Sequence, residues 1–542
     1  MLKYAAIILI LCSLSLLPIN LGTSPFWIDE SIMVMPAAKI LETGVPSVAF
    51  DSNFMPWQIK NNIWDPATPL YRYALSLFIW LFGLSEFSAR FFSVLCGILC
   101  IGIWYIFFRD IYGKKIALIT IMLTAASPVF IKYAREARYF TLLMLLIAFT
   151  LYFLHKAVNS RVHSGRFLWP SFMLMTVLTH PMGFLVIPII AGYLLLNKTR
   201  IYFQKCDYLT FLILLVIYLP TFMMFWDTLP FFHRVDSSNH ISGYQPSLFY
   251  YFEIIYSIVA HVIPKGMLRS FRNEFAFVLS LNPLLFLLGL VIVISSLIVT
   301  RKQNSKDNSK LILLWFFIPL SLLSMQEVKF PRYIIIYALP LCFLVIAHAI
   351  YCISTLPLVK KYQDFLISFL VCTVIILPQI RVATSDGLIS SEGRLKVENR
   401  QFGYLKYIIK PSADNFEGIT FQYKFLKDKL KKDDIIITTL DDASLSFYLN
   451  RTVYGFLNNK HSDEFFLNFL KRGQRIWFID SLEWGNFCLT DDKEPVWIDC
   501  RKKYEKFYNI ISTSSNIAAS FENVKIYLYN KNADSEIYAG KK

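Results

Sequence analysis

The first 380 residues consist of long apolar runs separated by short polar loops. A helix that crosses about 30 Å of hydrocarbon needs roughly 20 apolar residues. On that length scale the pattern predicts about eleven membrane-spanning helices, the first of them an uncleaved anchor because no small-x-small cleavage site follows it. The expected spans are 3–21, 90–108, 115–131, 139–155, 167–180, 182–197, 208–226, 276–300, 311–325, 333–351 and 362–380.

Basic residues orient these spans. The loops 109–115, 156–166, 198–205, 301–310 and 360–361 all contain Lys or Arg, and all lie on one face of the membrane. The positive-inside rule makes that face cytoplasmic, with the N-terminus on the same side. The apolar segment 70–83 is short for a span and contains Arg72, so we expect an interfacial helix within an outer loop at 22–89.

The pattern changes after residue 380 to one typical of soluble domains. Strands are predicted at 433–440, 451–456, 474–480 and 523–530, and helices at 443–449, 463–473 and 504–512. Alternating strands and helices indicate an α/β domain at 381–542, which an odd number of spans places on the extracytoplasmic side. Cys488 and Cys500 lie in this region, where they either form a disulfide or remain two free thiols.

Composition agrees with a membrane protein. The chain is 56% hydrophobic and 17% charged, whereas soluble domains average about a quarter charged residues. The net charge of +16 at pH 7 falls largely in the loops described above, so it indicates membrane orientation and not nucleic-acid binding.

An acidic pair, Asp29 and Glu30, follows the first span directly and lies beside Trp27. The simplest interpretation is a pair of acids at a helix N-terminus, where the helix dipole favours negative charge. The functional interpretation is a general base that accepts a proton from a hydroxyl nucleophile. The pair is also able to bind a divalent cation, but two carboxylates do not define a metal site.

Basic clusters recur on the same outer face. They comprise Arg90 at the start of the second span, Arg135, Arg138 and Tyr139 in "KYAREARYF", and Lys329, Arg332 and Tyr333 in "EVKFPRYIIIYALP". Arg135 and Arg138 share a face if their segment is helical. Paired guanidiniums bind phosphate oxygens, although arginines at helix ends also snorkel to the interface. His180 is either a helix-end residue or a side chain that lines the site.

Four segments resemble the type C glycosyltransferases of the protein O-mannosyltransferase and aminoarabinose transferase group. They are "FWIDESIMVMPAAKILETGVPS", "DPATPLYRYALSLFIWLFGLSEFSARFFSVLCG", "SPVFIKYAREARYFTLLMLL" and "KFPRYIIIYALPL". The resemblance implies that Asp29 is the base, with Glu30 beside it, and that Arg332 and Tyr333 lie near the lipid phosphate. It also matches family motif positions to Arg90, Arg138 and Tyr139, as substrate-binding residues. Many relatives have a His or Lys before the Pro-Leu-Tyr of residues 69–71, where this chain has Ala67 and Thr68, so Asp65 is a candidate replacement.

The prediction is therefore a glycosyltransferase of a bacterial inner membrane that uses a polyprenyl-phosphate sugar on the extracytoplasmic face. A departing phosphate needs no general acid, unlike the leaving group in glycoside hydrolysis. Two alternatives stay open, a flippase or transporter of lipid-linked sugars and a non-catalytic scaffold. The acceptor classes that fit this reaction are a lipid, a glycan and a protein.

Overall fold

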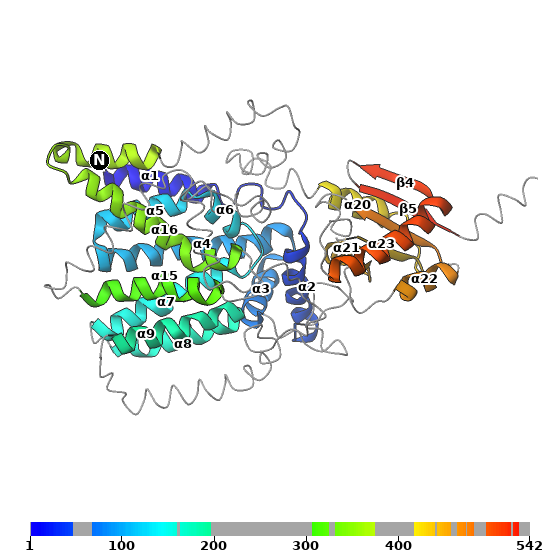
Figure 1. Cartoon of the computed structure of the whole chain (residues 1–542), viewed down its shortest axis with the longest axis horizontal. Helices are drawn as coiled ribbons and strands as arrows, with labels where there is room; N and C mark the ends of the chain where they lie inside the picture. Colours follow the sequence, from blue (N-terminus) through cyan, green and yellow to red (C-terminus); the bar gives the residue numbers. More distant parts are fainter. Residues whose placement is uncertain are drawn as a thin grey trace, which may run out of the picture.

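The computed structural model describes most of two regions of the chain, an N-terminal bundle of helices and a C-terminal sheet covered by helices (Figure 1). The described residues are 2–46, 68–159, 163–196, 306–324, 331–373, 417–439, 442–456, 463–472, 474–481, 495–521 and 524–530.

The long helices of the bundle run side by side (Figure 1). They are α1 (Leu2–Ser15), α4 (Glu86–Tyr112), α5 (Lys114–Ala125), α7 (Phe140–Asn159), α8 (His163–Thr179), η1 (Pro181–Leu185) with α9 (Val186–Leu196), α15 (Lys306–Ser324) and α16 (Pro331–Ser354). A further helix covers 363–373. Within the described residues, Glu86–Tyr112, Phe140–Asn159 and Ile336–Ser354 are long and apolar enough to cross a membrane. The predicted spans 208–226 and 276–300 lie outside the described residues.

The predicted span 115–131 is not one continuous helix. α5 ends at Ala125, and a short helix, α6 (Pro128–Ala134), begins after Ser127, whose Oγ accepts a hydrogen bond from the backbone N–H of Phe130. Pro128 has no N–H to continue the preceding helix. Because α6 ends at Ala134, the segment from Arg135 to Tyr139 is a turn between helices. The condition under which Arg135 and Arg138 would share a helical face is therefore not met.

Two helices lie across the end of the bundle that is next to the sheet (Figure 1). α2 (Ile28–Thr43) ends at Gly44, whose φ of 77° is a left-handed conformation that glycine adopts at low cost. α3 (Pro69–Phe82) covers the segment predicted to be interfacial. Arg72 is buried on α3 and donates to the carbonyl of Ile32 at 3.4 Å, so it joins the two crossing helices.

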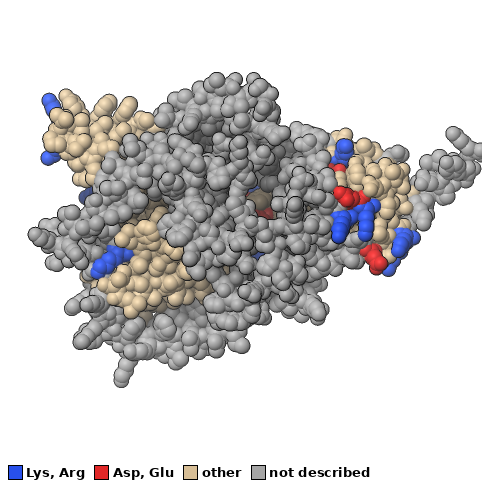
Figure 2. All heavy atoms as spheres, viewed as in Figure 1, with Lys and Arg blue, Asp and Glu red and all other residues tan. Residues whose placement is uncertain are grey.

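Basic loops meet at the opposite end of the bundle. Lys115 pairs with Asp364 at 3.4 Å, and Lys156 pairs with Asp110 at 2.6 Å. Among the described residues, the charged side chains visible on one face gather on the C-terminal region, while the bundle shows a few basic groups at this far end (Figure 2). The arrangement agrees with basic loops on a single membrane face.

The C-terminal sheet has five strands in the order β2-β1-β3-β5-β4. β1 (Ile435–Thr438), β2 (Tyr454–Gly455) and β3 (Ile476–Ser481) are parallel, whereas β5 (Val524–Tyr529) runs antiparallel to both β3 and β4 (Asn516–Phe521). The helices are α20 (Glu417–Lys427), α21 (Asp442–Leu449), α22 (Asp463–Lys471) and α23 (Pro495–Ser514). The strands and helices expected from the pattern are present, and α20 and β4 are additions.

Candidate active site

The first turn of α2 carries both acids of the Asp29–Glu30 pair, as the N-terminal position predicted. Their environments differ. The Glu30 side chain is 1% exposed and the Asp29 side chain is 18% exposed. Consecutive residues of a helix point about 100° apart, so the backbone itself separates the two carboxylates.

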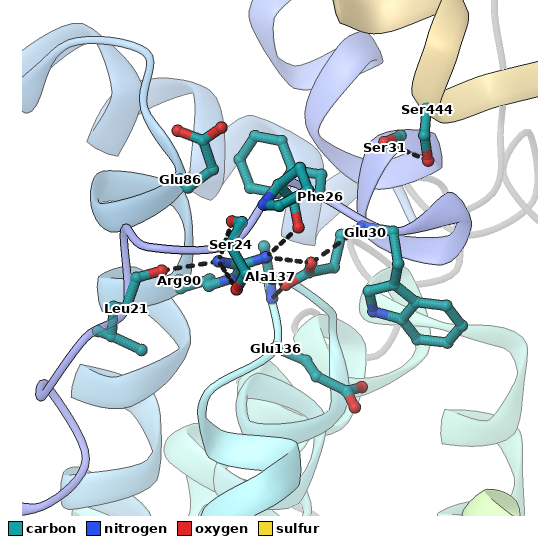
Figure 3. A network of polar contacts seen from close by, with 12 residues as sticks. Leu21, Ser24, Phe26, Glu30, Ser31, Glu86, Arg90, Glu136, Ala137 and Ser444 are labelled. Carbon is teal, nitrogen blue, oxygen red and sulfur yellow. Dashed lines mark hydrogen bonds and ion pairs between the residues drawn. The ribbon is translucent and has the colours of Figure 1, made fainter. Parts of the chain in front are cut away.

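Glu30 is bound to Arg90 of α4 in a bidentate ion pair (Figure 3). Arg90 Nε donates to Glu30 Oε1 at 2.8 Å, and Arg90 Nη2 donates to Glu30 Oε2 at 2.7 Å. The backbone N–H of Ala137 also donates to Oε1 at 2.8 Å. Glu30 therefore ties α2 to α4 and to the turn after α6.

Arg90 also organises the loop that leads into α2 (Figure 3). Its Nη1 donates to the carbonyls of Leu21 and Ser24 at 2.7 and 2.8 Å, and its Nη2 donates to the carbonyl of Pro25 at 2.9 Å. The guanidinium carbon lies 5.3 Å from the ring centroid of Phe26. Because all three nitrogens of the guanidinium donate to protein groups, the structure gives Arg90 a structural role at this site.

Asp29 is paired with a different arginine. Asp29 Oδ2 lies 2.9 Å from Arg138 Nη1. The Arg138 side chain is 6% exposed, and its guanidinium lies 4.4 Å from the ring centroid of Phe140 and 5.4 Å from that of Trp27. A planar guanidinium packed against aromatic rings is held in one orientation, and it holds its carboxylate partner in turn.

The turn that carries Arg138 is itself supported from α3 and α4. Ser93 Oγ donates to the carbonyl of Arg138 at 3.2 Å and lies 3.2 Å from the hydroxyl of Tyr71. Thr141 Oγ1 donates to the carbonyl of Ser93 at 2.9 Å. The position of Arg138 is thus set by buried hydrogen bonds and not by solvent-exposed contacts.

Sequence reasoning missed Glu136. Its Oε2 lies 3.9 Å from Arg138 Nη1, so a second carboxylate approaches the guanidinium that pairs with Asp29. Glu136 projects from the turn that also carries Ala137 (Figure 3). The sequence feature that could have indicated Glu136 is its position between two arginines in "AREAR". Among the described residues, no group of three or more His, Cys, Asp or Glu side chains is arranged to hold a metal ion.

Tyr139 and His180 extend the site toward α16. Their rings stack with centroids 3.9 Å apart and planes 14° apart. His180 Nδ1 accepts the backbone N–H of Met182 at 3.1 Å, and the Met182 carbonyl accepts from the Tyr337 hydroxyl at 2.6 Å. Tyr337 lies on α16 little more than one helical turn after Arg332.

The remaining predicted residues divide into two groups. Arg135 contacts the turn that follows α1, where Nη1 donates to the carbonyl of Leu16 at 3.3 Å and Nη2 to that of Ile19 at 2.5 Å, so its partners differ from those of Arg138. Arg332 and Tyr333 belong to the first turn of α16, but their side chains are outside the described residues, as are Asp65 and Lys329.

Comparison with known proteins gives the fold. Residues 66–226 match the family of dolichyl-phosphate-mannose-protein mannosyltransferases. ArnT from Cupriavidus metallidurans bound to undecaprenyl phosphate is 15% identical, with a TM-score of 0.60 and coverage of 96% of this chain and 97% of that chain. The archaeal oligosaccharyltransferase AglB from Archaeoglobus fulgidus, in complex with an inhibitory peptide and a dolichol-phosphate, is 12% identical, with a TM-score of 0.55 and coverage of 98% and 75%.

The protein has the type C glycosyltransferase fold. The resemblance seen in the four sequence segments is thereby confirmed. Among curated protein sequences, none matches this chain. The type C glycosyltransferase fold and the apolar helices together make this a multi-pass membrane protein. The matched family segment contains Arg90, Arg138 and His180 but begins after Asp29, so the family match does not bear on the acidic pair.

Proposed function

We propose that the protein is a membrane glycosyltransferase that moves a sugar from a polyprenyl-phosphate donor to an acceptor hydroxyl, with Asp29 as the general base. The observation that carries the proposal is the contrast between the two acids. Glu30 is enclosed by Arg90 and Ala137, whereas Asp29 is partly exposed and oriented by Arg138. Undecaprenyl phosphate and dolichol-phosphate bound to the two structural relatives support a lipid-phosphate donor.

In the proposed reaction, Asp29 accepts the proton of the acceptor hydroxyl as its oxygen attacks the anomeric carbon of the sugar. The bond from that carbon to the phosphate oxygen breaks, and the lipid phosphate leaves as an anion. Positive groups that meet the developing phosphate charge supply the remaining stabilisation. Arg332 and Tyr333, with Lys329, are the candidates for this role from α16 and its preceding segment, and Arg138 keeps the base oriented. A single displacement of this kind inverts the anomeric centre.

The basic loops at the far end of the bundle support a reaction on the extracytoplasmic face under the positive-inside rule. We propose a location in a bacterial inner membrane on this basis and from the Lys-, Ile-, Asn- and Phe-rich composition. Acceptors on that face include glycolipids, envelope glycans and protein hydroxyls. Mass spectrometry of envelope glycolipids and glycoproteins, from cells with and without the protein, identifies the product.

The test of the mechanism is Asp29→Asn in purified protein reconstituted into lipid nanodiscs. Loss of a positioned general base lowers turnover by about 10²–10⁴-fold, while insertion and thermal unfolding stay close to wild type. Glu42→Gln on the same helix is the matched control, because Glu42 forms an exposed pair with Lys39. Full turnover by Asp29→Asn would remove Asp29 from the mechanism. Movement of a lipid-linked sugar across the bilayer without any transfer would favour the flippase alternative.

A further inference from the structure

A short helix of the C-terminal region, α21, contacts the candidate active site. Ser444 Oγ of α21 lies 3.3 Å from Ser31 Oγ of α2 (Figure 3). Phe447 packs against Met35, one turn further along α2. α21 therefore lies along the helix that begins with Asp29 and Glu30.

Tyr448, near the end of α21, makes the most specific of these contacts. Its hydroxyl accepts the backbone N–H of Phe26 at 2.6 Å and donates to Glu86 Oε1 at 2.8 Å. Glu86 belongs to the first turn of α4. One phenol thus links the C-terminal region, the loop before α2 and the helix that carries Arg90.

The Tyr448 ring is fixed and its hydroxyl remains a donor. It stacks on Tyr423 of α20, with centroids 4.5 Å apart and planes 15° apart. Burial and the neighbouring charge of Glu86 raise the pKa of Tyr448 above its ordinary value, so the phenol stays protonated at physiological pH.

The loop before α2 is held from two sides. On one side Arg90 donates to loop carbonyls and lies over the Phe26 ring. On the other side Phe447 makes an edge contact with that ring, with the centroids 5.5 Å apart, and the Tyr448 hydroxyl accepts the backbone N–H of Phe26. Phe26 lies only three positions before Asp29. A shift of Phe26 therefore moves the carboxylate that we propose as the base.

We propose that Tyr448 is a positioning residue for Asp29, and that the C-terminal region takes part in catalysis by holding the active-site loop through α21. The inference rests on the proposed function, because only the proposed function makes Asp29 a catalytic base. It also makes a structural claim that stands apart from activity. Without the Tyr448 hydroxyl, the segment 21–31 should become more dynamic.

Tyr448→Phe tests both claims because it keeps the ring and removes the hydroxyl. A misplacement of about 1 Å costs up to about a hundredfold in rate. We expect kcat to fall about tenfold to a hundredfold. KM for the lipid donor should stay nearly unchanged, because the substitution perturbs the loop before α2 and leaves the contacts to the donor intact. Amide hydrogen exchange in 21–31 should accelerate, while exchange in the sheet strands stays as in wild type.

Tyr508→Phe is the matched control. The Tyr508 hydroxyl lies 3.3 Å from that of Tyr527 within the C-terminal region, so its loss should alter neither kcat nor exchange in 21–31. Glu86→Ala removes only the bond that anchors the Tyr448 hydroxyl to α4, so it should reproduce the Tyr448→Phe phenotype in weaker form. It also serves as the second variant if Tyr448→Phe yields little folded protein.

The outcomes separate the two proposals. Wild-type kcat and wild-type exchange in both Tyr448→Phe and Glu86→Ala would overturn the positioning role. A rise in KM with kcat unchanged would overturn it too, since that pattern indicates a donor contact. If Asp29→Asn keeps full turnover, the proposed base is wrong, and faster exchange at 21–31 in Tyr448→Phe would still support the link between α21 and the loop.

Discussion

Replacing Glu30 by Gln should destabilise the protein far more than replacing Asp29 by Asn, although both changes remove one negative charge from the first turn of α2. Glu30 accepts hydrogen bonds from two nitrogens of Arg90 and from the backbone of Ala137, with its side chain almost fully buried. The amide nitrogen of Gln is a donor, so it would face another donor in this site. Arg90 would then carry a buried charge with no counter-ion.

The two costs differ in size. Breaking a buried ion pair by removing one partner costs about 3–5 kcal/mol. In Asp29→Asn the amide oxygen still accepts from Arg138, and the position is partly exposed, so the loss should be about 1 kcal/mol. Replacing Glu30 and Arg90 together by apolar residues should not restore stability, because the carbonyls that Arg90 satisfies would lose their donor.

Thermal unfolding in detergent micelles, followed by tryptophan fluorescence, measures the difference. Glu42→Gln, at an exposed pair on the same helix, is the control for loss of one charge from α2. We expect the midpoint to fall clearly for Glu30→Gln, slightly for Asp29→Asn and not at all for Glu42→Gln. A Glu30→Gln midpoint equal to that of the control would refute the structural role assigned to Glu30.

Three further predictions follow from single contacts. Arg138→Lys keeps the charge but loses the planar guanidinium that orients Asp29, so kcat in the transfer assay should fall about tenfold to a hundredfold. Gly183→Ala should lower the stability of the protein in thermal unfolding by about 1–3 kcal/mol, because a Cβ there would lie 2.3 Å from the backbone oxygen of Thr176. A Cβ at Gly102 would meet nothing within 4 Å, so Gly102→Ala should leave the stability unchanged. Burial raises the pKa of Asp480, so its ionisation costs stability as pH rises through that pKa. Asp480→Asn should therefore raise the unfolding midpoint at pH 7, and the gain should shrink as the pH is lowered to 4; a gain that is independent of pH would contradict this cause.

Local pattern predicted those elements that have a continuous apolar run or a clear alternation of apolar and polar residues. The run Ile435, Ile436 and Ile437 gave β1, and the alternation of apolar and polar residues in "NVKIYLYN" gave β5. β4 was missed because "NIAASF" contains few large apolar residues, and the sheet alone makes it a strand through pairing with β5. The break before α6 was readable from Ser127 and Pro128, which form a capped helix start.

The sequence pointed to the charged residues of the two ion pairs but not to their pairing. The sequence indicated an acidic pair and three basic clusters on one face, and the structure joins Asp29 to Arg138 and Glu30 to Arg90. Which carboxylate meets which guanidinium depends on how α2 crosses the bundle, a tertiary property without a local signal. The role of Tyr448 could not be predicted for the same reason, since it contacts Phe26 across a separation of 422 positions in the chain.

The adjacent acids of α2 thus have separate tasks because a helix turns about 100° at each residue. The inward carboxylate neutralises a buried arginine, and the same arginine gathers the loop before α2 through its remaining donors. The outward carboxylate then sits on a helix start that is fixed in place, paired with Arg138 and partly exposed, as the proposed base requires. Favourable interaction with the helix dipole would apply equally to both acids. It accounts for neither their unequal burial nor their separate partners, so the dipole alone does not explain the pair.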